Sequence, residues 1–547
     1  ARGYTAWDTT SPAFLKEDQT GITLYIPTAF ISYRGETLDK KVPLLRSMEA
    51  VSTQAMRILK TLGNTTAERV ITSVGPEQEY FLVDKEFYDQ RPDLIIAGRT
   101  IFGAAPSKGQ ELDDHYFGSI KERVACFMHE LNHELWKLGI SAKTQHNEVA
   151  PNQFELATIY NTANVATDHN QIVMETLQKI AYRHNLVCLL HEKPFKDFNG
   201  SGKHNNWSMA TDDGVNLLEP GDSPHSNAQF LLFLSAVIKA VDTYAPLLRM
   251  AASNTGNDHR LGGHEAPPAI ISIFLGDILT DVLEKLAADQ PVKVTNGVHL
   301  EVGVNTLPKL PKHLTDRNRT SPFAFTGNKF EFRMVPSSQS IAEANTILNT
   351  TVAGVLREFA DRLEGDIKAG KEINEAVAAL VKETYRAHSR VVFNGNGYSD
   401  EWVEEAEKRG LPNIKSTVDA IAEMTKTEAV KLFESQRVYS KEELESRQEI
   451  CFEKYSKQVA IEANIMLSMA RKSIIPAVNR YAGEIARTAS SIYAVDPQLD
   501  VSPQTGLLKR VLDALKGFES ELTVLEQQLN EAMGMDEGSF EQARFYR

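Results

Sequence analysis

Polar side chains recur at every second residue in several short apolar segments, and this pattern constrains the fold more than any other feature. The polar sets are Glu77 and Glu79, Glu148 facing Glu155 across a predicted hairpin, His204 with Asn206 and Ser208, and Glu331 with Arg333. Alternate residues of a β-strand point to the same face of a sheet. A solvated strand face would explain any one set. Together the sets predict one antiparallel sheet with a polar face.

The stretch from Asn199 to Ser208 joins a glycine-rich bend to one of these predicted strands. A strand face seldom carries histidine, asparagine and serine together unless it meets a ligand. The Gly-Ser-Gly sequence in the bend also suits an ordinary loop. We therefore treat the segment as a candidate binding strand.

Five glutamates on one sheet face need a source of positive charge. Two carboxylates about 4 Å apart repel each other by roughly 4 kcal/mol at an effective dielectric constant near 20. Such a face is tolerable only if the groups spread into water or share cations. A single histidine among oxygen ligands favours Mg²⁺ or Mn²⁺ over zinc.

Composition narrows the class of protein. The chain has 547 residues, of which 42% are hydrophobic and 24% charged, as in globular proteins with a large core. Its net charge of −14 argues against a nucleic-acid partner and against anionic membrane surfaces. The three cysteines form no Cys-x-x-Cys pair and no long apolar run is present, so a cytoplasmic protein is predicted. The chain opens at Ala1 without methionine, and we expect a further segment upstream.

Hydrophobic spacing predicts the elements that carry these residues. Helices are expected at 42–62, 120–138, 164–190 and 229–250, and strands at 70–83, 144–149, 153–158 and 329–334. The segment 253–265 is expected to be a loop, and 291–313 an insertion or connector. Beyond Gln339 the chain is expected to be almost entirely helical and to serve packing and assembly.

Residues 129–133, His-Glu-Leu-Asn-His, match a zinc-protease pattern on a predicted helix. The same helix uses Val124, Leu131 and Leu135 as a core stripe, and no third ligand follows nearby. We therefore favour an ordinary amphipathic helix over a zinc site.

The chain contains no P-loop and no convincing dinucleotide-binding fingerprint. A nucleotide would therefore be held by metals and arginines. Arg260, Arg319 and Arg333 are the candidates, although each alone is more often a surface ion pair.

Together these motifs resemble those of glutamine synthetase, specifically the large type III bacterial class. Matching motifs run through 75–81, 146–155, 199–208, 260–267, 318–321 and 331–333 in family order. The resemblance implies an α+β fold, in which a curved antiparallel sheet with flanking helices is followed by a C-terminal helical extension. It divides the chain into a remnant of an N-terminal β-grasp domain with a linker (1–40), a catalytic domain (41–350) and a helical region (351–547).

The resemblance also implies roles for individual residues. Glu79, Glu148 and Glu155 would hold one divalent cation, and Glu77, His204 and Glu331 the second, which meets ATP phosphates. The substrate glutamate would be positioned by Asn199, Gly200, Arg260 and Arg333. Arg319 would face the transferred phosphoryl group, Asn206 and Ser208 the adenine end of the nucleotide, and Glu265 matches the glutamate of a flap that closes the site. The predicted catalytic residues are Glu265, Arg319, Arg260 and Arg333.

The implied activity is an ATP-dependent ligase that converts L-glutamate and ammonia into L-glutamine through a γ-glutamyl phosphate. Two or more Mg²⁺ or Mn²⁺ ions per site and a homo-oligomer of stacked hexameric rings are implied as well. The alternatives are a ligase of the same fold that joins glutamate to another amine, or a non-catalytic sensor or scaffold.

The sequence departs from the family pattern in two places. In the family the aspartate of the ammonium site lies in the β-grasp domain, of which we expect only the end in this chain. A second arginine expected five residues after Arg319 is replaced by Ala324, and Lys329 takes the place of another phosphate-facing arginine. Glycines 256, 262 and 263 would give the 253–265 loop the freedom of a lid.

Overall fold

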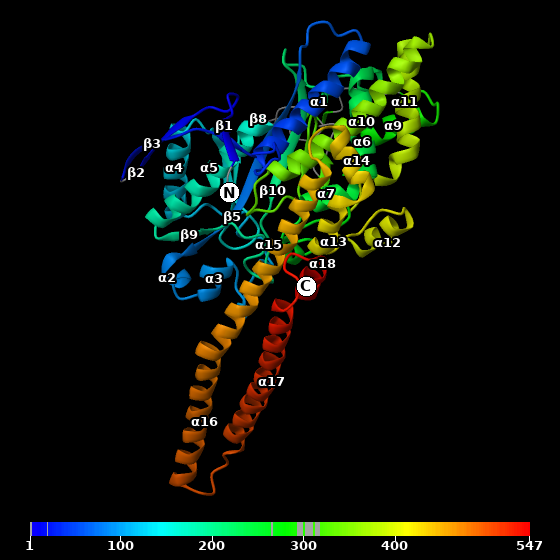
Figure 1. Ribbon diagram of the computed structural model, residues 1–547. Helices are drawn as coiled ribbons and strands as arrows, with labels where there is room; N and C mark the ends of the chain where they lie inside the picture. Colours follow the sequence, from blue (N-terminus) through cyan, green and yellow to red (C-terminus); the bar gives the residue numbers. More distant parts are fainter. Residues whose placement is uncertain (1–2, 19, 264–265, 293–298, 301–309, 312–317) are drawn as a thin grey trace. The chain divides into compact units, whose positions relative to one another are not determined.

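The computed structural model describes residues 3–18, 20–263, 266–292, 299–300, 310–311 and 318–547 (Figure 1). The strands are β1 (Gly3–Trp7), β2 (Phe14–Asp18), β3 (Gly21–Tyr25), β4 (Thr28–Ser32), β5 (Val70–Asp84), β6 (Ala142–Asn147), β7 (Gln153–Thr158), β8 (Asn161–Thr162), β9 (Leu186–Leu189), β10 (Lys203–Thr211), β11 (Ile273–Phe274), β12 (His299–Leu300), β13 (Leu310–Pro311), β14 (Phe323–Phe325) and β15 (Phe330–Phe332). The helices before the C-terminal region are α1 (Lys41–Thr61), α2 (Lys85–Tyr88), α3 (Pro92–Ala97), α4 (Glu122–Lys137), α5 (Ala163–Arg183), α6 (Ala228–Thr243), α7 (Ala245–Ala251), α8 (Thr255–Arg260) and α9 (Asp277–Ala287). Those that follow are α10 (Ala342–Lys368), α11 (Ile373–His388), α12 (Asp400–Lys408), α13 (Thr417–Ile421), α14 (Thr427–Ser435), α15 (Lys441–Met469), α16 (Ile475–Val495), α17 (Ser502–Met533) and α18 (Phe540–Tyr546).

One large sheet organises the first part of the chain. Its strand order is β11-β14-β15-β10-β5-β7-β6, and β8 and β9 also pair with β5. All of these pairs are antiparallel except β11 with β14. The predicted α+β class is therefore confirmed, with a sheet that is mixed at one edge.

The register of this sheet decides which side chains share a face. Glu77 pairs with His204, Glu331 with Asn206, and Glu79 with Glu155. Residues directly opposite each other on neighbouring strands point to the same side. The polar residues of β5, β7, β10 and β15 therefore lie on one face, as the alternation predicts.

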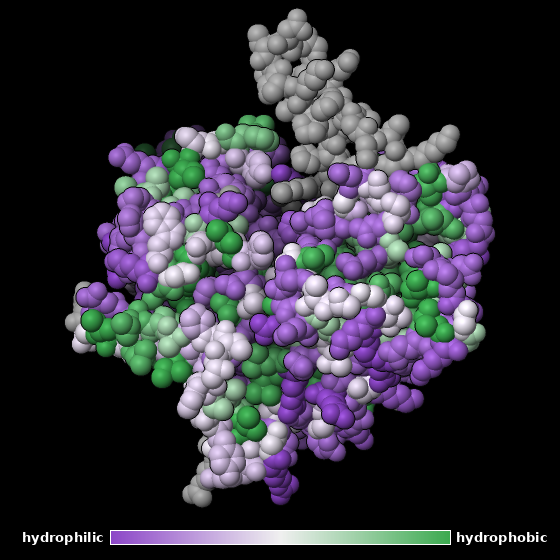
Figure 2. Space-filling model, turned by 90° about the horizontal axis from the view of Figure 1, so that it is seen from above, coloured by the Kyte–Doolittle hydropathy of each residue, from purple (hydrophilic) through white to green (hydrophobic). Residues whose placement is uncertain are grey.

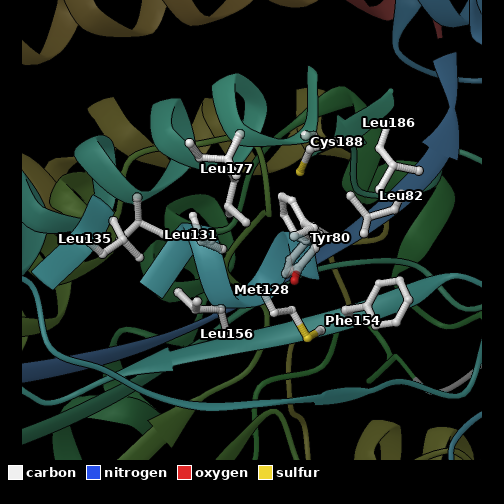
Figure 3. Packing of buried hydrophobic residues seen from close by; sticks show 14 of the residues in the cluster. Tyr80, Leu82, Met128, Leu131, Leu135, Phe154, Leu156, Leu177, Leu186 and Cys188 are labelled. Atoms are coloured by element: carbon white, nitrogen blue, oxygen red, sulfur yellow. The ribbon is translucent and has the colours of Figure 1, made fainter. Parts of the chain in front are cut away.

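The opposite face of the same strands packs into a hydrophobic core. Tyr80 of β5 and Phe154 and Leu156 of β7 alternate with the polar residues and are buried. They join Leu131 of α4 and Leu177 of α5 in one cluster (Figure 3). Burying such side chains contributes about 1.5–3 kcal/mol each. Because a shift of one residue would turn this set outward, the core fixes the register that gathers the carboxylates.

The predicted helix 164–190 ends earlier than expected. α5 stops at Arg183, Asn185 adopts a left-handed φ of 53°, and the next residues form β9 against β5. Asparagine tolerates this conformation better than most residues. A short buried apolar run has no periodicity that separates a strand from a last helical turn, which is why the prediction was wrong there.

The predicted helix 229–250 consists of two helices, α6 and α7, with a bend of 80° between them. Pro246 stands in the first turn of α7, where its missing N–H cannot continue the hydrogen-bond ladder of α6. Within the described ranges no single helix is long and apolar enough to cross a membrane, although this bent pair passes that test by length and composition.

The chain forms two compact units: Ala1–Asp84 with Ser107–Gln448, and Lys85–Pro106 with Glu449–Arg547. The first contains the large sheet. In the second, α16 and α17 lie side by side, and Leu467, Leu522 and Leu529 form a small hydrophobic cluster (Figure 1). The helical character predicted beyond Gln339 is confirmed.

Hydrophobic and hydrophilic residues are interspersed over the face shown in Figure 2. More than half of a folded protein's accessible surface is ordinarily apolar. This mixed surface therefore points to no particular partner.

Candidate active site

The polar face of the sheet brings Glu77, His204 and Glu331 together from three strands. His204 Nδ1 lies 3.2 Å from Glu77 Oε2 and 3.2 Å from Glu331 Oε1. One ligand atom from each residue lies within 4.8 Å of the other two. The structure therefore gathers the three residues predicted to hold the second cation.

Arg333 adjoins this group. Its Nε donates to Glu331 Oε1 over 2.8 Å and its Nη2 to Oε2 over 3.1 Å, which makes a bidentate ion pair. The two side chains are 5% and 9% exposed. Burial opposes ionisation of Glu331, but His204 and Arg333 outweigh it and hold the pKa of this carboxyl well below its usual range. Glu331 is therefore charged whether or not a cation is present.

Glu79 and Glu155 form a second group with His204, whose Nε2 lies 3.8 Å from Glu79 Oε1. Glu148, the third residue predicted for this cation, falls instead in a group with His146 and Glu155. Glu155 belongs to both groups. The predicted ligands thus form one continuous cluster, and the structure does not separate them into the two predicted sets.

Glu148 and Glu155 come together at the hairpin, as predicted, but they are not the directly paired residues. His146 is the residue paired with Glu155, and its Nε2 lies 2.9 Å from Glu155 Oε1. Glu148 follows the end of β6, and its backbone N–H donates to Gln153 O over 2.8 Å. The length of the turn sets this offset. His146 was missed, although its position two residues before Glu148 carries the same alternation signal.

Carboxylate crowding changes protonation at this end of the cluster. Burial, reinforced by the charges of Glu79 and Glu155, raises the pKa of Glu148 to about 8. The hydrogen bond that His146 donates to the Glu155 carboxylate raises the pKa of His146 to about 9. Carboxylates with too little positive charge nearby retain protons. An oxygen-rich, negatively charged donor set with two imidazoles fits a hard divalent cation, whose charge would replace those protons.

Arg260, the last residue of α8, lies against the glycine-rich bend. It is 3% exposed, and its Nη2 donates to Arg333 O over 3.0 Å. A Cβ at Gly200 would lie 2.8 Å from Arg260 Cγ, and one at Gly202 only 2.2 Å from Arg260 Nη2. A Cβ at Gly200 would also lie 2.3 Å from Glu192 O, so the close approach of that backbone, as well as of the arginine, requires glycine there.

The segment 253–265, predicted as a loop, contains helix α8. The Asn254 side chain caps the helix by accepting from Gly256 N–H over 2.6 Å. A Cβ at Gly256 would lie 2.1 Å from Glu192 Oε2, so this glycine permits close packing, and its predicted part in a lid stays a prediction. Glu265 lies outside the described residues, and its predicted flap role stays a prediction.

Asn199 and Gly200 are held in place by two glutamines. Gln110 Nε2 donates to Asn199 Oδ1 over 2.6 Å, and Asn199 N–H donates to Gln110 Oε1 over 2.9 Å. Gln153 Nε2 donates to Gly200 O over 2.9 Å. Sequence reasoning missed Gln110, since it lies in an irregular segment with no pattern that marks it.

Asn206 and Ser208 share the face of His204, as predicted. Asn206 Nδ2 donates to Glu77 Oε1 over 2.9 Å, so this amide orients a predicted cation ligand. Ser208 Oγ lies 2.9 Å from Asn328 O and 3.0 Å from Asn216 Oδ1. In this structure both side chains bond to protein groups.

Arg319 is exposed and contacts Tyr116, whose ring lies near His146 of the acidic cluster. Its Nη2 donates to the Tyr116 hydroxyl over 3.1 Å, and its guanidinium carbon lies 5.5 Å from the ring centre. The Tyr116 ring is 6.3 Å from that of His146. Tyr116 is a further residue that the sequence patterns did not indicate.

At two positions the family pattern expects an arginine and this chain carries another residue. Ala324, which stands where the resemblance expects an arginine, is fully buried and pairs with Glu331. Lys329 is half-buried in the turn between β14 and β15. Ala324 therefore lies on the same sheet face as Glu331, but its methyl group carries no charge that could bind a phosphate.

The His-Glu-x-x-His helix does not gather a zinc site. Glu130 binds Arg183 Nη1 over 2.7 Å and His184 Nε2 over 2.8 Å. His129 and His133 are exposed, and their rings contact each other at 4.6 Å. Among the residues with described positions, the groups of potential metal ligands do not include this helix. The amphipathic-helix interpretation therefore stands.

Comparison with known proteins identifies similar families and relatives. The family description "Glutamine synthetase, catalytic domain" matches residues 54–271, "Glutamine synthetase type III N terminal" matches 1–47, and "Glutamine synthetase C-terminal domain" matches 376–493. The type-3 glutamine synthetase of Dictyostelium discoideum is 49% identical over 90% of this chain and 67% of its own length. The glutamine synthetase of Butyrivibrio fibrisolvens is 47% identical over 100% of this chain and 76% of its own. That of Bacteroides fragilis is 42% identical over 97% and 73%.

Proposed function

The chain belongs to the glutamine synthetase family, and we propose that the polar face of its large sheet is the site of that family's reaction. The chain is an ATP-dependent glutamate–ammonia ligase, and the family uses divalent metals. The observation that carries the placement of the site is the convergence of five carboxylates, two imidazoles and buried Arg333 on one sheet face.

We propose that this cluster holds two or more Mg²⁺ ions, with Mn²⁺ as the alternative. Glu77, His204 and Glu331 would hold one ion, and Glu79, Glu148 and Glu155 the other. His146 lies close enough to Glu148 and Glu155 to take part. Divalent cations supply charge that neutralises ATP phosphates and the phosphoryl group in transfer.

The substrate glutamate is proposed to bind where Asn199, Gly200, Arg260 and Arg333 meet. The backbone carbonyl of Arg333 joins it to Arg260, and both arginines are buried, so their positions are well defined. Arg319 is assigned to the phosphoryl group, and Asn206, Ser208 and Lys329 to the nucleotide. These roles follow from matching motif positions, and Asn206 and Ser208 also share the sheet face of His204.

The chemistry explains why such residues are needed. A carboxylate oxygen is a poor leaving group, so forming an amide requires activation of the γ-carboxylate of glutamate by ATP. The resulting γ-glutamyl phosphate reacts with ammonia and would hydrolyse if water entered. Arginine side chains stabilise the negative charge that spreads over the transferring phosphoryl group. Glu265 is proposed to accept the proton that the attacking nitrogen loses.

We further propose an assembly of stacked hexameric rings and a cytoplasmic location. The division into 1–40, 41–350 and 351–547 likewise stays a proposal.

Calorimetry tests the site directly. We expect ATP to bind in the presence of Mg²⁺ and to lose measurable binding in Glu331→Gln, which keeps the side-chain shape and removes its charge. Glu428→Gln, at an exposed position of α14, is the matched control and should bind like the parent protein. Equal ATP binding by both variants would remove the cation assignment. Phosphate release measured with ammonia and with a panel of other amines separates the ligase from its same-fold alternative.

A further inference from the structure

The C-terminal region contributes a loop that contacts the arginine-bearing segment of the site. Residues 394–398, Asn-Gly-Asn-Gly-Tyr, are called here the 394–398 loop. Asn318 Nδ2 donates to the carbonyl of Asn394 over 3.2 Å and to that of Gly395 over 2.7 Å. The residue after Asn318 is Arg319, so the loop holds the backbone next to this arginine.

The contact continues along the segment residue by residue. Gly397 N–H donates to Thr320 Oγ1 over 2.7 Å, and the Tyr398 hydroxyl donates to Arg319 O over 3.1 Å. A Cβ at Gly397 would lie 2.5 Å from Thr320 O. The glycine is therefore required for the two backbones to approach this closely.

The 394–398 loop is itself firmly anchored. The rings of Phe393 and Trp402 stack with centroids 3.7 Å apart, and Trp402 is almost fully buried. Asn394 Oδ1 accepts from Leu275 N–H over 3.2 Å and from Gly276 N–H over 3.1 Å. A loop fixed by packing and by side-chain hydrogen bonds can hold a neighbouring segment in one position.

The Asn318–Thr320 segment, which the 394–398 loop contacts, includes Arg319 and also bonds to Arg333. Arg333 Nη1 donates to the carbonyl of Asn318, and Arg319 extends from the next residue to Tyr116. One loop from the C-terminal region is thus linked to Arg319 and, through Asn318, to Arg333.

We propose that the 394–398 loop is a positioning element that holds Asn318–Thr320 so that Arg319 faces the reacting phosphoryl group. The inference rests on the role proposed above for Arg319. It gives the C-terminal region a part in the chemistry, in addition to the packing and assembly expected from its sequence. An arginine whose backbone is free to shift by about 1 Å loses much of its value in a preorganised site.

Two variants of the full-length protein test the proposal by steady-state kinetics. Tyr398→Phe removes one hydrogen bond and should lower kcat about fivefold, while KM for glutamate changes less than about twofold. Gly397→Ala forces the loop away from Thr320 and should lower kcat about tenfold or more. Tyr493→Phe, at an exposed position of α16, is the matched control, with kinetics of the parent protein. Thermal unfolding should give similar melting temperatures for Tyr398→Phe and the control.

A double-mutant cycle separates positioning from general destabilisation. In an Arg319→Lys background, which keeps the charge and loses the planar fork, Tyr398→Phe should have little further effect on kcat. Independent, multiplying effects would overturn the proposal, as would parental kinetics for both loop variants. If Arg319→Lys alone is fully active, the proposed role of Arg319 falls and the loop proposal falls with it. If only the loop variants are fully active, the site stands and the loop proposal alone is wrong.

Discussion

The two ends of the acidic cluster share one sheet face but differ in how their charges are balanced. At the β15 end, Glu331 has a buried bidentate arginine partner and a pKa held well below its usual range. At the β6–β7 end, Glu148 has a pKa raised to about 8 by burial and by its carboxylate neighbours. The residue types are the same, so the difference comes from the partners. Arginine brings a permanent charge, whereas His146 brings one only when protonated.

The comparison indicates what each end needs from a cation. The Glu331–Arg333 pair is complete without a metal ion, so this end is preorganised. The Glu148–Glu155 end retains protons because too little positive charge lies nearby, and a divalent cation would displace those protons. We therefore expect the two ends to respond oppositely when one carboxylate is neutralised.

The largest effect is expected for Arg333→Met. This change leaves the Glu331 carboxylate buried with one positive partner fewer and should lower the free energy of unfolding by about 3–5 kcal/mol. Urea denaturation followed by circular dichroism measures it. Arg319→Met, at an exposed arginine, should change stability by less than about 0.5 kcal/mol. Equal losses of stability in the two variants would mean that the buried Glu331–Arg333 pair stabilises the protein no more than exposed Arg319 does.

Cation removal should have the next largest effect. At a free Mg²⁺ concentration about 100 times the dissociation constant, binding to the folded state alone stabilises a protein by about 2.7 kcal/mol. Thermal unfolding should therefore shift to lower temperature when a chelator removes Mg²⁺. A melting temperature that is independent of Mg²⁺ would contradict the cluster as a cation site.

The effect of Glu155→Gln on stability should depend on whether a cation is present, which would separate the two ends of the cluster. Without a cation and above about pH 8, where Glu148 has lost its proton, removing one of several mutually repelling carboxylates should raise stability by about 1 kcal/mol. With Mg²⁺ present, the stabilisation by the cation should be smaller than in the parent protein. Glu331→Gln is the counterpart at the other end. It should lower stability under both conditions, because it leaves buried Arg333 without its charged partner.

The smallest effect is expected on α4. Replacing His129 and His133 by alanine should change stability by less than about 0.5 kcal/mol and leave Mg²⁺ binding unchanged, because both side chains are exposed and Glu130 bonds elsewhere. Differential scanning calorimetry and titration with Mg²⁺ measure the two quantities. A large loss of stability or of Mg²⁺ binding would mean that the histidines of α4 belong to a metal site.

Much of the fold was predictable because alternation and helical spacing are local signals. β5 and β7 begin where predicted, and α1 matches its predicted range within one residue at each end. Pro246 and Asn185 mark the places where prediction failed. At Pro246 a helix-breaking proline lies inside an apolar segment that was predicted as one helix. At Asn185 a buried strand follows a helix without any change in hydrophobicity.

The site was predictable to a lesser degree. Alternation identified the face of β5, β10 and β15, but it paired Glu148 with Glu155 where the register pairs His146. Gln110 and Tyr116 come from an irregular segment, and the 394–398 loop comes from a distant part of the chain. No local pattern connects such segments, because their contacts depend on how the whole unit packs.

The sequence by itself determined the sheet face, the acidic side chains that line it and the family, since these depend on residue identity at fixed spacing. The tertiary structure alone decided the strand register, the burial of Arg333 beside Glu331 and the contact of the 394–398 loop with Asn318–Thr320. The physical reason is that burial and electrostatic pairing arise between segments far apart in the chain. The same glutamate side chain therefore has a low pKa beside Arg333 and a high one among other carboxylates.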